Sequence, residues 1–289
     1  MSSQHPPTAN GLYNIDVCRY VHIATASAWL WDALVSFSTE VDAFMGRRLA
    51  LVDIVYWLSR ILTLLTVILE IVAVVKPSSV ARCNQFVHII SGAGTIVTCL
   101  CTFLLLVRAK GVFSHSQRAR YVFNTSWLIL VAGIIATVPF AFFGSSDNIT
   151  GYCIITRIDK TEIIAPVTVA VFDTAVFISI SYRILSIHSV TRTRWITFFI
   201  GREAGSISRA LLRAGILHFV SCLIVLLCLM IVGFSYSIPA DLLFQWRVAV
   251  YLASATFYNT VACRMFRSLR QVVPGITFTS TIQMSELRA

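Results

Sequence analysis

Residues 50–75 read ALVDIVYWLSRILTLLTVILEIVAVV, and this stretch decides the fold class. The hydrocarbon core of a bilayer is about 30 Å thick, so roughly 20 mostly apolar residues are enough for an α-helix to cross it. Six further stretches of similar length and character lie at 21–43, 84–107, 121–144, 162–186, 210–234 and 242–266. Seven such stretches predict a polytopic membrane protein.

The predicted fold class is all-α, a seven-transmembrane helix bundle. Lipid offers no partner for an unpaired backbone group, so only helices and closed barrels span a membrane, and these runs are too long for the strands of a barrel. Of all residues, 57% are hydrophobic and only 12% are charged, whereas a soluble domain carries about 25% charged residues. Soluble folds are therefore excluded.

The basic residues predict the orientation of the bundle. Lys and Arg in short loops are retained on the cytoplasmic side. One face would carry Arg47, Arg48, Arg108, Lys110, Arg118, Arg120, Arg183, Arg192, Arg194, Arg202, Arg209, Arg213, Arg264, Arg267, Arg270 and Arg288. The other would carry Arg19, Lys76, Arg82, Arg157, Lys160 and Arg247. The amino terminus should therefore lie outside and the carboxyl terminus in the cytosol. We interpret the formal charge of +10 as a result of these basic residues that set the topology, and not as a nucleic-acid-binding surface.

Three regions follow from this topology. Residues 1–20 would form a short extracellular or lumenal tail, because they lack the basic and apolar regions of a cleavable signal peptide. Residues 21–268 would form the transmembrane bundle, and residues 269–289 a cytosolic tail. The predicted localisation is multi-pass, in the plasma membrane or an endomembrane.

Two features of the predicted outer face are typical of an oxidising compartment. Asn148 begins the glycosylation acceptor Asn148-Ile149-Thr150 in the loop after the fourth span. Cys83, at the outer end of the third span, and Cys153, in that same loop, are a candidate disulfide, with Cys18 as a competing partner. The remaining cysteines are expected to be buried packing residues: Cys99, Cys101, Cys222, Cys228 and Cys263.

Charged residues inside the spans are costly and should face the bundle interior or have partners. Asp32 lies 11 residues from either end of the first span, and Arg60 lies at nearly the same depth in the second. At 1.5 Å per residue the two side chains should approach each other, directly or through water. The pair is either a structural contact that fixes helix packing or part of a ligand or proton site.

Other polar residues within the spans are candidates for ligand binding. Asp173 lies near the middle of the fifth span and has no basic residue at its depth in a neighbouring predicted span. It would serve as a protonated hydrogen-bond donor, as an anchor for a cationic ligand, or as a group capped by Thr and Ser neighbours. Glu70, His88 and Asn259 complete the candidate set, each with an interhelical packing role as the alternative.

Familiar enzymatic and cofactor motifs are missing from the sequence. There is no His-Glu-x-x-His pair and no Gly-x-Ser-x-Gly elbow. The six histidines are scattered, so no metal site is predicted. Retinal needs a lysine within the bundle, and the only lysines are Lys76, Lys110 and Lys160, all at boundaries or in loops. No cofactor is predicted.

Several short motifs resemble an abundant, uncharacterised seven-span membrane protein family of basidiomycete fungi. They are Ser38-Thr39-Glu40-Val41 followed by Tyr56-Trp57-Leu58-Ser59-Arg60-Ile61-Leu62, then Asp173-Thr174-Ala175-Val176-Phe177 with Ser181-Tyr182-Arg183-Ile184, and Asn259-Thr260-Val261-Ala262-Cys263-Arg264-Met265-Phe266-Arg267. The resemblance implies a receptor-like bundle of unknown ligand, and it implies no activity.

Three functional hypotheses remain open. The first is a receptor-like protein that responds to a small or lipidic ligand and signals to a cytosolic partner such as a G protein, although the usual Asp/Glu-Arg-Tyr and Asn-Pro-x-x-Tyr signatures are missing. The second is a small membrane enzyme, a cyclase or isomerase acting on a lipid-like substrate, with Asp173 or Glu70 as proton donor. The third is a transporter, which typically has internal repeats and broken helices that this chain lacks.

Overall fold

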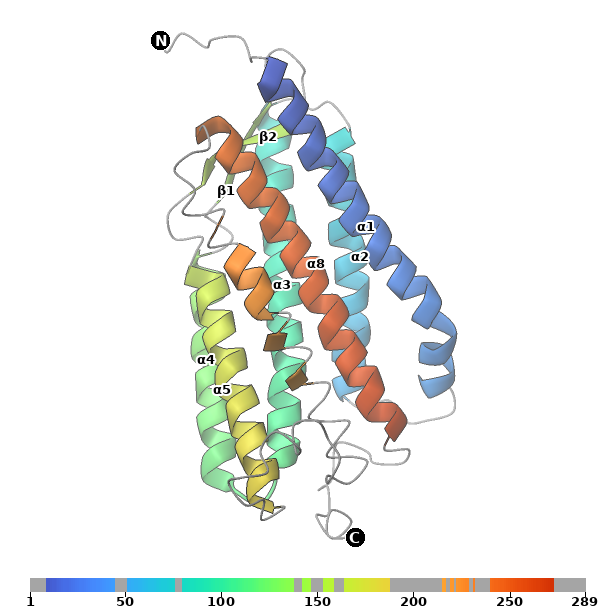
Figure 1. The fold of residues 1–289 in the computed structure, drawn as a ribbon, viewed down its shortest axis with the longest axis vertical. Coiled ribbons are helices and arrows are strands. Elements are labelled where there is room, and N and C mark those ends of the chain that lie inside the picture. The colour runs from blue at the N-terminus through green and yellow to red at the C-terminus, as the bar shows by residue number, and fades with distance from the viewer. Residues whose placement is uncertain are drawn as a thin grey trace.

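The computed structural model describes residues 9–44, 51–75, 80–137, 142–146, 153–158, 164–187, 215–216, 219–220, 222–228, 231 and 240–272. Six long helices run along the molecule (Figure 1). They are α1 (Ala9–Phe44), α2 (Leu51–Val75), α3 (Val80–Val112), α4 (Gln117–Thr137), α5 (Ile164–Ile187) and α8 (Ala240–Val272). The predicted spans at 21–43, 50–75, 84–107, 162–186 and 242–266 thus coincide with helices.

Four of the described helices are long and apolar enough to cross a membrane. They are the segments Leu51–Ala73, Cys83–Val112, Gln117–Thr137 and Ile164–Arg183. Helices α1 and α8, with 36 and 33 residues, are long enough but are not among the four that qualify. The predicted sixth span, 210–234, lies mostly outside the described residues. Within the described part, the protein is a helical membrane bundle with four qualifying spans, fewer than the seven predicted.

Helix α3 occupies the centre of the bundle. It packs against α2, α4, α5 and α8, and α1 packs mainly against α8 (Figure 1). One core cluster joins Val87 of α3, Ile134 of α4 and Val176 of α5, and a second joins Tyr56 of α2 to Phe266 of α8, whose rings stack at 5.1 Å. The helices on either side of α3 are therefore tied to it through apolar side chains.

A short hairpin lies between α4 and α5, which corrects the expectation of a purely helical chain. Strand β1 (Phe142–Ser146) pairs antiparallel with β2 (Cys153–Ile158), and the register shifts between Phe143 and Gly144. The predicted fourth span was wrong in continuing as helix to residue 144. Strand β1 reads FFGSS, and Pro139 precedes it in the sequence. Proline disfavours helical geometry in the residue before it, and aromatic residues favour strands.

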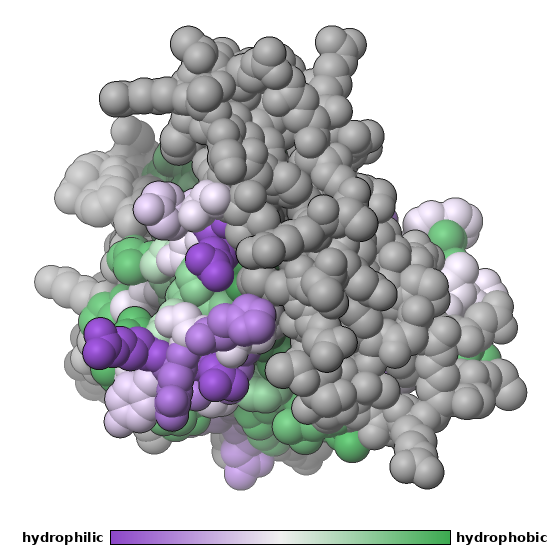
Figure 2. Space-filling view, turned by 90° about the horizontal axis from the view of Figure 1, so that it is seen from below, coloured by the Kyte–Doolittle hydropathy of each residue, from purple (hydrophilic) through white to green (hydrophobic). Residues whose placement is uncertain are grey.

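The outside of the bundle is largely apolar, as expected of a surface in contact with lipid. Large exposed side chains include Trp31 and Val35 on α1, Ile129 on α4 and Ile178 on α5, which are 71%, 61%, 73% and 59% exposed. Seen from below in Figure 2, hydrophilic side chains gather at one end of the bundle, with apolar side chains around them. The predicted bilayer contact is consistent with this distribution.

Candidate functional site

Two carboxylates and three arginines form an ionic cluster between α1, α2 and α8, in which both carboxylates and Arg60 are buried. Arg60 Nη2 lies 3.2 Å from Asp32 Oδ2 and 3.0 Å from Glu40 Oε1. Arg264 donates through Nε to Asp32 Oδ1 at 2.7 Å. Arg267 contacts Asp32 at 3.4 Å and also pairs with Glu40. The predicted contact between Asp32 and Arg60 is thus present, as part of a five-residue cluster.

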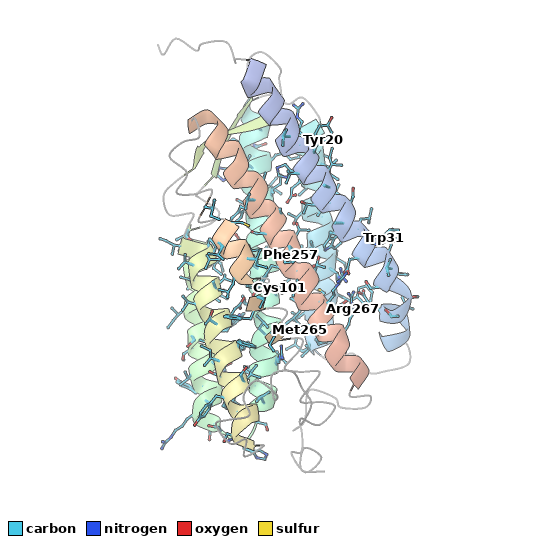
Figure 3. All side chains as sticks on the ribbon, in the orientation of Figure 1. Tyr20, Trp31, Cys101, Phe257, Met265 and Arg267 are labelled. Atoms are coloured by element: carbon cyan, nitrogen blue, oxygen red, sulfur yellow. The ribbon has the colours of Figure 1, made fainter. Side chains whose placement is uncertain are left out.

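Helical spacing explains how the cluster assembles. Asp32, Ser36 and Glu40 are four residues apart in sequence, so they lie along one face of α1. Arg60 and Tyr56 are related in the same way on α2, and Tyr56 donates to Glu40 at 2.6 Å while Arg60 also donates to Ser36 at 3.3 Å. Figure 3 shows Arg267 on the side of α8 that faces α1. Three helices thus present their charged faces to one another.

Arg60 is held by aromatic rings as well as by carboxylates. Its guanidinium carbon lies 5.8 Å from the ring centre of Trp29 and 5.9 Å from that of Tyr56. Its Nε and Nη1 atoms have no hydrogen-bond partner among the described residues. Cation–π attraction to the two rings offsets part of the free energy lost on burying these nitrogens.

Asn259 connects the ionic cluster with the middle of the bundle. Its side chain is 0% exposed; its Oδ1 accepts from Trp29 Nε1 at 3.3 Å and its Nδ2 donates to Cys101 Sγ at 3.5 Å. Cys263, one turn further along α8, contacts Asn259 Oδ1 at 3.8 Å and Ser59 Oγ at 3.9 Å. The predicted polar residue Asn259 therefore joins α1, α3 and α8, which is an interhelical packing role.

Replacing Asn259 by Leu is expected to lower the free energy of unfolding by about 1–3 kcal/mol, because the buried Trp29 Nε1 donor loses its acceptor. Thermal or denaturant unfolding of the purified protein measures this change. In the background of Trp29→Phe, which removes the donor, the same replacement should cost clearly less. Equal costs in the two backgrounds would show that the Trp29–Asn259 hydrogen bond contributes nothing.

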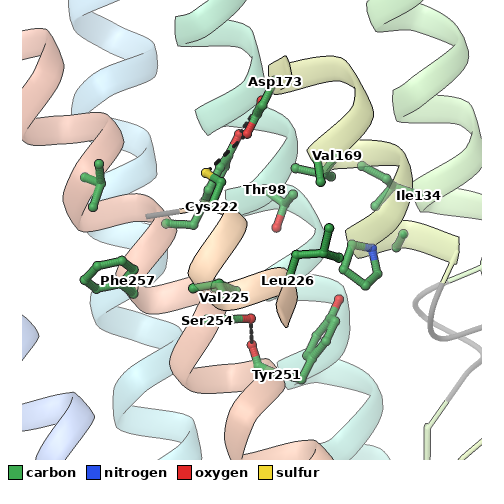
Figure 4. A pocket seen from close by; sticks show the side chains of 16 residues that line it. Thr98, Ile134, Val169, Asp173, Cys222, Val225, Leu226, Tyr251, Ser254 and Phe257 are labelled. Carbon is green, nitrogen blue, oxygen red and sulfur yellow. Dashed lines mark hydrogen bonds between the residues drawn. The ribbon is translucent and has the colours of Figure 1, made fainter. Parts of the chain in front are cut away.

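An apolar pocket of about 80 Å³ lies between α3, α4, α5, residues 222–228 and α8 (Figure 4). It runs from Pro166 near the start of α5 to Asp173, which is about 10 Å along the helix at 1.5 Å per residue. The lining consists mainly of aliphatic and aromatic side chains: Ile134, Ala165, Pro166, Val169, Ala170, Val225, Leu226, Tyr251, Ala255, Phe257 and Val261, with the polar Thr98, Asp173, Cys222, Ser254 and Tyr258.

Asp173 is the charged residue among the described side chains that line this pocket. It is 3% exposed; its Oδ1 accepts from the Tyr258 hydroxyl at 3.1 Å and its Oδ2 accepts from Cys222 Sγ at 3.5 Å. A carboxylate accepts about four hydrogen bonds. The sequence singled out Asp173, but Tyr258 and Cys222 were missed because a tyrosine and a cysteine are common within spans.

Two further candidates, Glu70 and His88, are not among the described residues that line the pocket. Glu70 is 6% exposed and its Oε2 lies 4.0 Å from Nδ1 of His22 on α1, while its Oε1 has no hydrogen-bond partner among the described residues. His88 is half-buried on α3. The structure therefore does not bring the four candidates Asp173, Glu70, His88 and Asn259 into one site.

Cys83 is disulfide-bonded, whereas Cys99, Cys101, Cys222, Cys228 and Cys263 are not in disulfide bonds. The two other cysteines of the chain, Cys18 and Cys153, have side chains outside the described residues. Strand β2 starts at Cys153 and contacts α3, as a Cys83–Cys153 bond requires. This pairing stays a prediction. The glycosylation acceptor Asn148 also lies outside the described residues.

Among the described residues, no group of three or more His, Cys, Asp or Glu side chains is arranged to hold a metal ion. The ionic cluster contains only two carboxylates, and both are already paired with arginines. The chemistry that this region offers is therefore ion pairing and hydrogen bonding.

Residues 20–65 match a family of unknown function (DUF6533). No curated protein matches the chain. The match covers 46 of 289 residues and includes none of the described residues that line the pocket. It includes Asp32, Glu40 and Arg60 of the ionic cluster and their hydrogen-bond partners Ser36 and Tyr56. Over its first helix pair the chain is thus similar to a family of unknown function.

Proposed function

We propose that this protein is a seven-helix, receptor-like membrane protein, in which a small or lipidic ligand in the pocket changes the position of α8 and thereby the ionic cluster. The amino terminus lies outside and the carboxyl terminus in the cytosol. The observation that carries the proposal is that helix α8 contributes side chains to both the pocket and the ionic cluster. Tyr258 of α8 bonds to Asp173 in the pocket, and Arg264 and Arg267 of α8 bond to the cluster.

The length of α8 between the two regions supports such coupling. Tyr258 and Arg267 are nine residues apart, about 14 Å along the axis. Asn259 and Cys263 lie between them and contact α1, α2 and α3. A shift at one point of a helix is transmitted along the length of the helix. Packed interfaces respond to such a shift by switching between discrete arrangements.

The lining of the pocket supports a mainly apolar ligand. Most of its side chains are aliphatic or aromatic, and its polar groups are few. Ligand sites in proteins commonly combine an apolar wall with a small number of polar groups that fix orientation. Asp173 and Tyr258 would take that orienting role.

Replacing Ala255 by Leu tests the coupling, because the added carbons occupy the pocket as a ligand would. Cys263 is 0% exposed and reports on the packing between pocket and cluster. Allosteric coupling free energies are typically about 1–3 kcal/mol. We therefore expect the modification of Cys263 by a membrane-permeant maleimide to become at least about fivefold faster, as measured by mass spectrometry of the labelled peptide.

The matched control is Ala132→Leu, which places the same side chain on the exposed face of α4. This variant should leave the labelling rate of Cys263 at the wild-type value. If Ala255→Leu and Ala132→Leu label at the same rate, the pocket and the cluster are not coupled.

The proposal includes signalling to a G protein on the cytosolic side of the membrane. With the purified protein in a bilayer, nucleotide exchange on at least one host G protein should rise above the rate without the protein. Background exchange on every host G protein, with wild type and with Ala255→Leu alike, would rule this partner out.

A membrane enzyme is the second candidate, and the observation that favours it is a carboxyl group lining an apolar pocket. Asp173 would act as the proton donor toward a lipid-like substrate, whereas Glu70 is not among the described lining residues. Under this alternative Asp173→Asn abolishes turnover while expression is unchanged. Under the receptor proposal, a membrane extract gives the same product profile with the wild-type protein and with Asp173→Asn.

A further inference from the structure

Arg264 differs from the other arginines of the ionic cluster in its exposure. Its side chain is 60% exposed, whereas Arg60 is 5% and Arg267 is 15% exposed. Its Nε is fixed on Asp32 at 2.7 Å, and its two terminal nitrogens make no hydrogen bond within the described part of the chain. The terminal nitrogens of this exposed side chain are thus available to hydrogen-bond a further group.

Helix α1, which carries the partner of Arg264, has exposed apolar side chains. That partner, Asp32, lies on α1 between Trp31 and Val35, which are 71% and 61% exposed (Figure 3 shows Trp31 on the outer side of α1). Arg264 also falls within the predicted seventh span, two residues before its end. The exposed guanidinium therefore lies at the edge of the bilayer rather than in bulk water.

The charges of the cluster do not balance. Among the described residues, these ion pairs join three arginines to two carboxylates, so the five side chains together carry one positive charge in excess. The two carboxylates, Asp32 and Glu40, are only 7% and 4% exposed. The excess positive charge is therefore accessible at the exposed Arg264, where the cluster meets the membrane. A positive charge near lipid attracts anionic headgroups, and a planar guanidinium binds a phosphate through two parallel hydrogen bonds.

We propose that the seam between α1 and α8 binds the phosphate of an anionic phospholipid headgroup through the terminal guanidinium nitrogens of Arg264. The acyl chains of this lipid lie against the exposed apolar face of α1. Asp32 has a positioning role, because its bond to Nε fixes the plane of the guanidinium. The site is separate from the pocket, and it does not depend on the proposed ligand.

The test uses the full-length protein in lipid nanodiscs and measures by native mass spectrometry which lipids remain bound. With equal amounts of phosphatidylserine and phosphatidylcholine, the wild-type protein should retain phosphatidylserine with about fivefold preference, which corresponds to about 1 kcal/mol for one arginine. Arg264→Gln should reduce the preference to below about twofold. Arg264→Lys keeps the charge and should retain part of it.

The matched control is Arg118→Gln, which removes the same charge from an exposed position at the start of α4, on the predicted cytoplasmic face. This variant should keep the wild-type preference. Because the readout is a ratio between two lipids in one sample, a general loss of stability in Arg264→Gln does not mimic the expected result. If Arg264→Gln does not fold, Arg264→Lys is used instead. A preference in Arg264→Lys that equals the wild-type value and is reduced by free phosphate would decide against the site.

The proposal would be overturned by no preference in wild type, by an unchanged preference in Arg264→Gln, or by an equal loss in Arg118→Gln. Free anions are the competing occupant. If millimolar inorganic phosphate removes the phosphatidylserine preference of wild type, the site takes a soluble anion and the assignment to a lipid is wrong.

Discussion

Asp32→Asn is expected to lower the free energy of unfolding by about 3–5 kcal/mol, the range for removing one partner from a buried ionic group. Asp32 contacts Arg60, Arg264 and Arg267, so its loss leaves Glu40 to pair with Arg60 and Arg267, while Arg264 loses its carboxylate partner. The net charge of the cluster then rises from +1 to +2. Reversible unfolding in mixed micelles measures the effect.

Arg60→Met should cost less than Asp32→Asn, at most about 2 kcal/mol, although Arg60 is just as deeply buried. Its removal balances the remaining two arginines and two carboxylates, and it eliminates two nitrogens without hydrogen-bond partners among the described residues. The order of the two variants is the test. A larger loss for Arg60→Met would show that net charge does not govern the stability of the cluster.

Cys83→Ser is expected to produce the second large loss, up to about 4 kcal/mol if Cys83 pairs with Cys153. The bond would close a loop of about 70 residues, and the constraint on the unfolded chain grows with loop length. Helices that persist in the unfolded state within the membrane reduce this value. The melting temperature under non-reducing conditions measures the loss.

The cysteine variants also identify the partner. Cys153→Ser should match Cys83→Ser, and the double variant should be no less stable than either single one, because each removes the same bond. Cys18→Ser should leave the melting temperature unchanged. If Cys18→Ser reproduces the loss instead, the disulfide joins α1 to α3.

The helices were predictable because lipid imposes one requirement on every spanning segment, a long apolar run. Asp32 and Arg60 were predictable as partners because depth in the membrane follows from position along a helix. Glu40 was not singled out, although it lies eight residues from Asp32 and therefore on the same face of α1. That spacing was the signal in the sequence.

Arg264 and Arg267 were interpreted only as topology signals, since arginine at the end of a span usually reaches water. Their pairing with Asp32 and Glu40 depends on how α1 crosses α8, which a single sequence does not encode in a readable pattern. The pocket was missed for the same reason. Its polar residues, Asp173, Cys222 and Tyr258, come from three separate segments and meet only in the folded chain.

The hairpin between α4 and α5 shows a limit of hydropathy. Residues 142–144 are apolar enough to extend the fourth span, but they belong to strand β1. A count of apolar residues does not separate the two outcomes, whereas turn and strand preferences do.

The side of the membrane on which each terminus lies tests the central claim most directly, because depth, orientation and the proposed coupling all depend on seven crossings. Epitope tags at the two ends can be labelled by antibody in intact and permeabilised cells. We predict that the amino-terminal tag is labelled in intact cells and the carboxyl-terminal tag only after permeabilisation. Labelling of both tags under the same condition would mean an even number of crossings and would contradict the account.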